Sequence, residues 1–252
     1  MTKLLFALFL IISLFLSSCS VYEDIYFLEG GKVKYQITID ASELAALGEE
    51  SSLNINKGLP SDSIIYFSQL IKDSLKTIPA EIAQNMEDIS SLYVHIKRDK
   101  AKSEYKISIC GDFDNTEAFI KAFSSLSKLE EYIKENKPTA GSEFPTKILF
   151  DKTLIAWDGK VFKRIIDTTT ETEDAENTLE ESDQQIKDTI DAFAKLFSQG
   201  RMIVKYHFPK KIKNVSNDKA TFTLDGKTAI IEYPAMLFLE PTQDFSIEIE
   251  TE

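Results

Sequence analysis

The stretch Leu92–Ile109, LYVHIKRDKAKSEYKISI, is the clearest indication of the fold in this chain. Apolar and polar residues alternate on both sides of a charged centre, which is typical of two half-buried strands joined by a short loop. Pairing the strands across that centre sets Leu92 opposite Ile109 and Lys97 opposite Glu104. One register therefore aligns an apolar face and an opposite-charge pair, which predicts a β-hairpin.

Upstream of this hairpin, the pattern predicts a strand and then two helices. Residues 33–40 alternate between apolar and polar side chains, as in a half-buried strand. From Asp62 the apolar spacing becomes helical, and Pro79 separates two amphipathic helices. The apolar faces consist of Ile64, Phe67, Ile71 and Leu75 in the first helix, and of Ile82, Met86 and Ile89 in the second.

Two more helices are expected downstream. Asn115 or Thr116 is suited to cap a long helix, and Gly200 is suited to end a later one over residues 186–199. The apolar stripes consist of Phe119, Phe123, Leu126, Leu129 and Ile133 in the long helix, and of Ile186, Ile190, Phe193 and Phe197 in the later one.

The remaining segments predict strands. The dipeptide Asp-Gly supplies the positive φ that a tight hairpin turn needs, and it occurs twice in this half of the chain. The expected elements are hairpins over 147–166 and 220–233, turning at Asp158-Gly159 and Asp225-Gly226, and strands over 202–208 and 245–249.

Together these elements predict an α+β fold, in which antiparallel sheets of hairpins are covered by amphipathic helices. Pro138 and Pro145 flank a natural joint, so the expected regions are 31–137 and 138–252. They form one or two packed subdomains, and a single intertwined sheet is the alternative. Residues 167–183 contain eight acidic and no basic side chains, which predicts a solvated loop.

Composition excludes several classes of function. Of 252 residues, 43% are hydrophobic and 28% are charged, so the chain has the composition of a globular protein. The net charge of −12 makes a nucleic-acid partner unfavourable. Two His and two Cys leave few residues for metal centres or for nucleophile–base pairs.

The first eighteen residues have the pattern of a signal peptide that is removed. Lys3 precedes an apolar run from Leu4 to Leu16. Because a helix rises about 1.5 Å per residue, this run reaches roughly 20 Å, which is shorter than the ~30 Å hydrocarbon core of a bilayer. A cleaved export signal is therefore favoured over a permanent span.

The sequence Leu16-Ser17-Ser18-Cys19-Ser20 that follows resembles the lipobox of bacterial lipoproteins. The resemblance implies a diacylglyceryl group on the sulfur of Cys19, cleavage before this residue and a further acyl chain on its amino group. Two or more acyl chains anchor a protein stably to a bilayer. Residues 19–30 are then the lipidated Cys and a tether, and Ser20 after the anchor favours the outer membrane over the inner one.

The chain as a whole resembles an uncharacterised group of Bacteroidota lipoproteins of the flavobacterial type. Besides the lipobox, the resemblance rests on residues 64–67 and on the segment from there through the predicted hairpin. Glu23-Asp24 is similar to the acidic export signal of Bacteroidota surface lipoproteins, and ordinary solvated charges explain it equally well. The resemblance carries no catalytic residues.

Few residues offer chemistry. His95 lies opposite Lys106 in the predicted hairpin and His207 lies in a strand, and neither has the spacing of a metal site or a catalytic motif. Glycine motifs for phosphates or dinucleotides and the Gly-x-Ser-x-Gly elbow are missing from the sequence. If Cys19 is acylated, Cys110 is the one remaining thiol, and its strand context predicts partial burial.

Four weaker features have structural as well as functional interpretations. The ring of Trp157 covers its own hairpin or stacks on a sugar, and the acidic loop is a solvated linker or a weak cation site. Thr168 follows Asp167 in a pattern that resembles the Bacteroidota O-glycosylation sequon. A basic cluster pairs with the acidic loop or meets anionic headgroups, and it consists of Arg201, Lys205, Lys210, Lys211 and Lys213.

We therefore expect an outer-membrane lipoprotein with a non-catalytic ectodomain that binds or scaffolds an envelope protein or glycan. No cofactor or metal is expected. The alternatives are a carboxylate-dependent hydrolase of envelope glycans and a carrier of an apolar ligand. The face of the membrane on which the ectodomain lies stays open.

Overall fold

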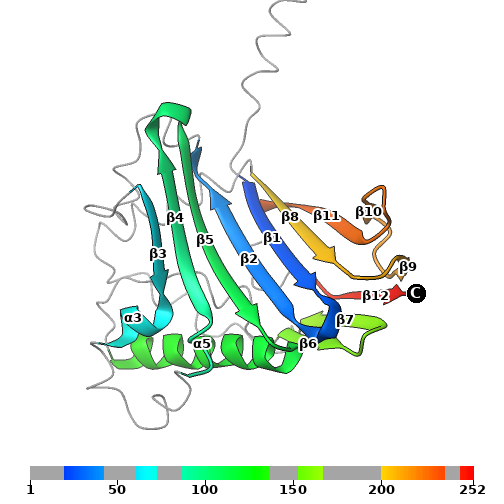
Figure 1. Ribbon diagram of the computed structural model, residues 1–252, viewed down its shortest axis with the longest axis horizontal. Coiled ribbons are helices and arrows are strands. Elements are labelled where there is room, and N and C mark those ends of the chain that lie inside the picture. Colours follow the sequence, from blue (N-terminus) through cyan, green and yellow to red (C-terminus); the bar gives the residue numbers. More distant parts are fainter. Residues whose placement is uncertain (1–19, 43–60, 73–86, 137–152, 167–199, 236–244) are drawn as a thin grey trace, which may run out of the picture.

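The computed structural model describes residues 20–42, 61–72, 87–136, 153–166, 200–235 and 245–252 (Figure 1). The strands are β1 (Ser20–Phe27), β2 (Val33–Asp40), β3 (Asp62–Tyr66), β4 (Leu92–Asp99), β5 (Glu104–Phe113), β6 (Thr153–Trp157), β7 (Val161–Ile166), β8 (Arg201–His207), β9 (Ile212–Val215), β10 (Thr221–Phe222), β11 (Thr228–Pro234) and β12 (Ile247–Thr251). The α-helices are α3 (Phe67–Lys72) and α5 (Thr116–Asn136), and short 3-10 turns cover Glu29–Gly31 and Lys100–Lys102.

The strands form two sheets. The large sheet has eight strands in the order β10-β11-β8-β1-β2-β5-β4-β3, and the small sheet has four in the order β6-β7-β12-β9. Neighbouring strands run antiparallel except β1 and β8, which are parallel. Strands from both sides of the joint expected near residue 138 therefore contribute to one sheet.

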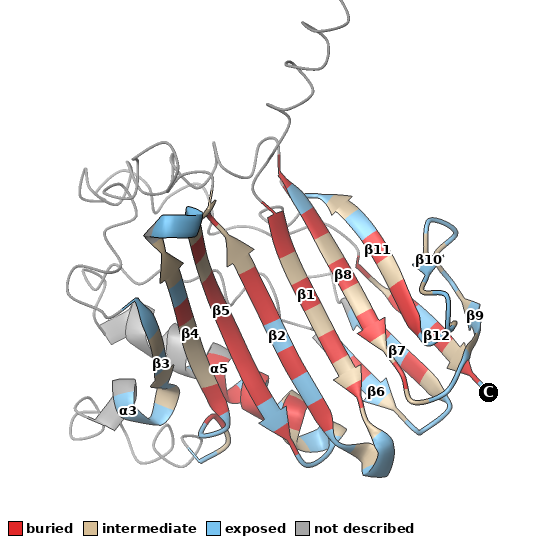
Figure 2. Ribbon diagram, turned by 45° about the horizontal axis from the view of Figure 1, so that its top comes forward, coloured by how far each residue is buried: buried red, intermediate tan, exposed pale blue. Residues whose placement is uncertain are grey.

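The predicted α+β class, with sheets covered by helices, is wrong. The part of the chain that the structure describes is dominated by strands, and its two α-helices are α3 and α5. Over β2 and β5, α5 does cover the apolar face, but over β1 and β8 the small sheet takes that place (Figures 1 and 2). The apolar face of a sheet is buried equally well by the apolar stripe of a helix and by the apolar face of a second sheet. Local sequence patterns therefore do not decide which of the two covers it.

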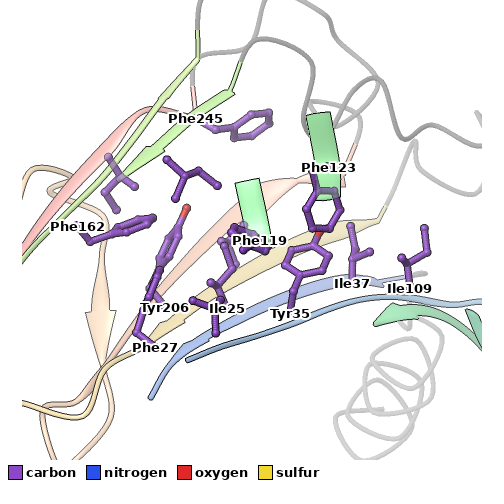
Figure 3. Close-up of a cluster of buried hydrophobic side chains, with 14 of the residues drawn as sticks. Ile25, Phe27, Tyr35, Ile37, Ile109, Phe119, Phe123, Phe162, Tyr206 and Phe245 are labelled. Atoms are coloured by element: carbon purple, nitrogen blue, oxygen red, sulfur yellow. The ribbon is translucent and has the colours of Figure 1, made fainter. Parts of the chain in front are cut away.

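The core has two halves that meet under the large sheet (Figure 3). Beneath α5, the rings of Phe119 and Phe123 lie 5.6 and 4.9 Å from that of Tyr35. Between the sheets, Phe27 of β1 contacts Phe162 of β7 with ring centres 5.0 Å apart. Aromatic residues thus join each covering layer to the large sheet.

The predicted tether is also wrong, because residues 20–27 form β1 near the middle of the large sheet. Val21, Ile25 and Phe27 are buried, and Glu23 is buried with them. This segment alternates like an ordinary half-buried strand. Its position next to the lipobox led to its interpretation as a tether instead.

The hairpin predicted over residues 92–109 is confirmed as β4 and β5, but its predicted register is wrong by two residues. Leu92 lies opposite Gly111, and Val94 opposite Ile109. Because side chains alternate with a period of two, such a slip leaves both faces unchanged and alternation cannot detect it. The turn decides the register: Ser103 has a φ of 50°, and Asp99 Oδ1 accepts hydrogen bonds from two backbone amides of the turn.

The helix expected from Asp62 is wrong in its first half. Residues 62–66 form β3 at the edge of the large sheet, and α3 begins only at Phe67. Five residues are too few to separate a strand from a helical turn by periodicity, and pairing with β4 decides. The second helix lies mostly outside the described residues, as do the helix over 186–199 and the acidic loop.

Several local predictions are confirmed. The side chain of Asn115 caps α5 by accepting a hydrogen bond from the amide of Ala118 at 2.8 Å. Both Asp-Gly turns are present, with φ values of 91° at Gly159 and 67° at Gly226. The strands expected at 33–40, 202–208 and 245–249 appear as β2, β8 and β12 with boundaries shifted by up to two residues.

Candidate functional site

The candidate binding surface is the face of the large sheet that points away from α5 and the small sheet, which we call the outer face. Two groups of partly exposed aromatic and charged side chains lie on it, separated by the outward side chains of β2 and β5. The His207 cluster consists of Tyr22, Asp24, Tyr26, Lys205 and His207; the His95 cluster consists of Asp62, Tyr66, Tyr93 and His95.

In the His207 cluster, the imidazole is held on three sides. Its Nε2 lies 2.8 Å from Asp24 Oδ1 and its Nδ1 lies 3.0 Å from Thr228 Oγ1. The ring of Tyr26 stacks on it at 3.9 Å with an interplanar angle of 5°. Both ring nitrogens of His207 are therefore engaged within the protein.

The other members of this cluster are tied to the same carboxylate. Lys205 Nζ lies 3.9 Å from Asp24 Oδ1 and 5.7 Å from the centre of the Tyr22 ring. Burial, and then the charge of Asp24, raise the pKa of the Tyr26 hydroxyl further above physiological pH, at which a tyrosine is already neutral. The cluster offers flat rings beside fixed charges.

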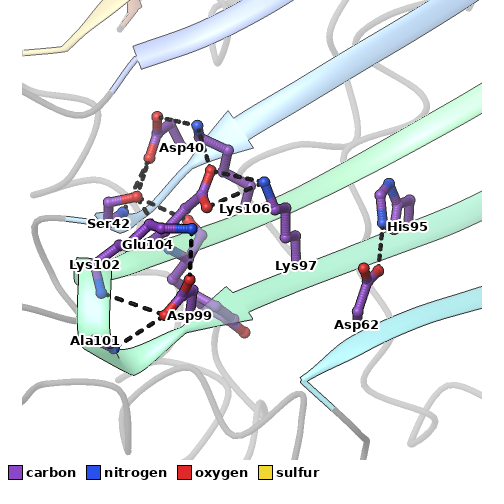
Figure 4. A network of polar contacts seen from close by, with 11 residues as sticks. Asp40, Ser42, Asp62, His95, Lys97, Asp99, Ala101, Lys102, Glu104 and Lys106 are labelled. Carbon is purple, nitrogen blue, oxygen red and sulfur yellow. Dashed lines mark hydrogen bonds and ion pairs between the residues drawn. The ribbon is translucent and has the colours of Figure 1, made fainter.

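The His95 cluster repeats this combination at the far edge of the sheet. His95 Nε2 lies 2.8 Å from Asp62 Oδ1, and Figure 4 marks this contact with a dashed line. The rings of Tyr66 and Tyr93 lie 5.6 Å apart, and Tyr66 is 44% exposed. His95 faces Ser108 rather than Lys106, which follows from the corrected register.

Between the clusters, the outer face carries mostly polar side chains of β2 and β5. Thr38 and Ser108 share a hydrogen bond of 2.8 Å, and Cys110 lies beside them, 6% exposed. Burial raises the pKa of the Cys110 thiol to about 11, against a smaller opposing effect of the Tyr93 hydroxyl. The predicted burial of Cys110 is confirmed.

This environment predicts an inert thiol. At pH 8 Cys110 is almost fully protonated, and only the thiolate is a good nucleophile, so we expect reaction with a disulfide reagent to be slow in the native protein and rapid in denaturant. The measurement is the rate at which a chromogenic disulfide reagent releases its coloured thiolate on reaction with Cys110. It is made in a Cys19→Ser variant, with and without guanidinium. Equal rates in both conditions would contradict the burial.

A buried ion pair lies on the opposite face of β1, between the two sheets. Arg164 Nη1 donates to Glu23 Oε2 at 2.8 Å and to Tyr206 Oη at 3.2 Å, and the Tyr35 hydroxyl donates to Glu23 Oε1 at 3.3 Å. The two charged side chains are 3% and 0% exposed. The interpretation of Glu23 as a solvated charge is therefore wrong.

The surroundings of Arg164 favour its charged state. Burial by itself lowers the pKa of Arg164, but Glu23 and Tyr206 outweigh that effect and raise it. Burial also raises the pKa of the two tyrosines, which remain neutral donors and acceptors. Sequence analysis missed this pair, although Glu23 occupies an inward position between Val21 and Ile25 in the alternation of β1.

The other sequence candidates are distributed as follows. Trp157 packs against the rings of Phe27 and Phe208 at 5.3 and 5.1 Å, so its ring has a structural role, but it packs against β1 and the end of β8 rather than covering its own hairpin. Thr168 lies outside the described residues. The basic residues do not form one cluster: Arg201 pairs with Glu232, Lys205 with Asp24 and Lys213 with Glu250.

Two further features concern ions and membranes. Within the described ranges, no group of three or more His, Cys, Asp or Glu side chains is arranged to hold a metal ion. None of the helices in those ranges has the length and hydrophobicity to cross a bilayer.

The fold and the site define a mainly β protein of two facing sheets and one covering helix, with an aromatic and charged outer face. No family model matches the chain, and no curated protein matches it. Among solved structures, the folded domain of the LppM protein of Mycobacterium tuberculosis is distantly similar, with a TM-score of 0.36 and 8% identity over 93% of this chain and 89% of that one. A likeness of this size assigns neither family nor function.

Proposed function

We propose that this chain is an outer-membrane-anchored lipoprotein whose ectodomain binds or scaffolds an envelope partner, a protein or a glycan, without catalysis. The anchor part rests on the lipobox resemblance at Cys19. The binding part rests on one observation, the outer face with its two clusters of tyrosine rings and charged groups. Rings of this kind stack on sugars and anchor protein interfaces.

The geometry of His207 favours binding over catalysis. A general base needs a nitrogen that reaches the proton of a substrate. In His207 both nitrogens are engaged by Asp24 and Thr228, and the ring is stacked on Tyr26. Such a side chain is well suited to hold a surface in one shape.

The anchor is tested with the variant Cys19→Ser in the native host. We expect the wild-type protein in the membrane fraction with the added mass of the acyl chains, and the variant in the soluble fraction without it. Mass spectrometry and detergent partitioning measure both. An unchanged distribution and a non-acylated wild type would overturn the anchor.

Binding is tested by capture of partners from solubilised envelopes. We expect partner recovery to fall in a Tyr66→Ala variant, because the ring is exposed and contributes to the outer face. Leu154→Ala is the matched control, since this residue is 66% exposed on the small sheet. Equal recovery with both variants would remove the outer face from the interaction, and cleavage of envelope glycans by the ectodomain would overturn the non-catalytic role.

A further inference from the structure

The position of the anchor relative to β1 constrains how the body meets the membrane. Cys19 is joined by one peptide bond to Ser20, which is buried and is the first residue of β1. Consecutive Cα atoms are about 3.8 Å apart. An acyl chain on Cys19 is thus attached directly to a central strand of the large sheet, with no tether between them.

The residues that share this end of the sheet follow from the strand register. One row crosses the sheet from Ser20 to Asp40 in β2, to Lys106 in β5 and to Lys97 in β4. Strands are spaced by about 4.8 Å, so Lys97 lies roughly 14 Å across the sheet from Ser20. The β4–β5 hairpin continues beyond that row to the turn at Lys100–Lys102 (Figures 1 and 4).

This hairpin is basic in an acidic protein. Residues 97–106 contain five basic and two acidic side chains, a balance of +3 in a chain of net charge −12. The basic residues are Lys97, Arg98, Lys100, Lys102 and Lys106, and the acidic ones are Asp99 and Glu104. Asp40 of β2 lies 3.7 Å from Lys106 and reduces that excess to +2, whereas ion pairs within the hairpin, such as Lys102 with Asp99 at 3.0 Å, leave it unchanged.

A depression at the opposite end of the sheet is acidic, although Lys32 and Lys34 pair with two of its carboxylates, Asp114 and Asp112. This depression, beside the end of β5 and the start of α5, is lined by five acidic side chains and one basic one. They are Glu87, Asp88, Asp112, Asp114, Glu117 and Lys121. Among the described residues, this depression is therefore acidic, whereas the hairpin at the end that carries the anchor is basic.

We propose that the Ser20 end of the large sheet faces the bilayer and that the β4–β5 hairpin contacts anionic phospholipid headgroups. The inference rests on the proposed anchor at Cys19. Basic side chains gain from an anionic surface only within about a Debye length of 8–10 Å, and the anchor brings the hairpin into that range. The acidic depression is held away from the bilayer surface, where repulsion by the headgroups is weak.

The test compares two fluorophore positions in the full, processed protein. Ala101→Cys labels the exposed hairpin turn, and Glu29→Cys labels the exposed turn after β1 at the other end of the sheet. The eight residues of β1 separate these ends by roughly 25 Å. The proteins are reconstituted in phosphatidylglycerol-containing vesicles with an acceptor dye on the headgroups, and energy transfer to the acceptor is measured.

We expect several-fold more energy transfer from the label at 101 than from that at 29. Replacing Arg98 and Lys102 by Glu in the Ala101→Cys protein is expected to lower this transfer, as is high salt. Equal transfer from both positions in acylated protein would overturn the orientation and leave the anchor intact. Protein without acyl mass would overturn the proposed anchor, and the orientation with it.

Discussion

Replacing Arg164 by methionine is expected to lower the free energy of unfolding by about 3–5 kcal/mol. The variant leaves the Glu23 carboxylate at 0% exposure without its positive partner at 2.8 Å. A buried charge that loses its partner keeps the full cost of leaving water. The measurement is guanidinium denaturation followed by circular dichroism.

A second arginine–glutamate pair in the same protein provides the matched control. Arg201 and Glu232 lie 3.4 Å apart and are more than half exposed. Arg201→Met is expected to cost less than about 1 kcal/mol, because water screens such pairs. If both variants lost similar stability, the buried pair would have no special role in joining the two sheets.

Replacing Phe119 by alanine is expected to cost about 3–5 kcal/mol. The side chain is 0% exposed, and its ring lies 5.6, 5.3 and 5.1 Å from those of Tyr35, Phe113 and Phe123. Its removal leaves a cavity between α5 and the large sheet that these rings cannot fill without leaving their positions.

Denaturation of this variant is compared with that of Ser124→Ala, an exposed position on the same helix. Ser124→Ala is expected to change stability by no more than about 0.5 kcal/mol. A loss below about 1 kcal/mol in Phe119→Ala would show that α5 is not a tightly packed layer of the core.

These two predictions concern the two ways in which the large sheet is covered. Arg164 reports on the small sheet over β1 and β8, and Phe119 reports on α5 over β2 and β5. Sequence patterns identified the α5 half, because the stripe of this helix and its cap at Asn115 are local features. Sequence patterns missed the half of the core between the two sheets, because the sequence of a strand does not indicate which layer covers its apolar face.

The candidate binding surface was predicted in part. Alternation placed His95 and Cys110 together on the more polar face of the hairpin, and the structure keeps them there. It did not show that His207, in β8, stacks on Tyr26, in β1. The parallel pairing of these strands brings together residues that are far apart in the chain, and no local pattern encodes it.

The sequence alone determined the features that depend on neighbouring residues: the Asp-Gly turns, the cap of α5, the inward and outward faces of the strands, and the lipobox-like segment before β1. Tertiary structure decided what depends on distant partners: the place of β1 inside the large sheet, the two-residue register of the β4–β5 hairpin and the contact between the sheets. Glu23 and Arg164 are 141 residues apart. Burial of either charge alone is costly. The attraction between the two charges offsets that cost only when folding buries both side chains together.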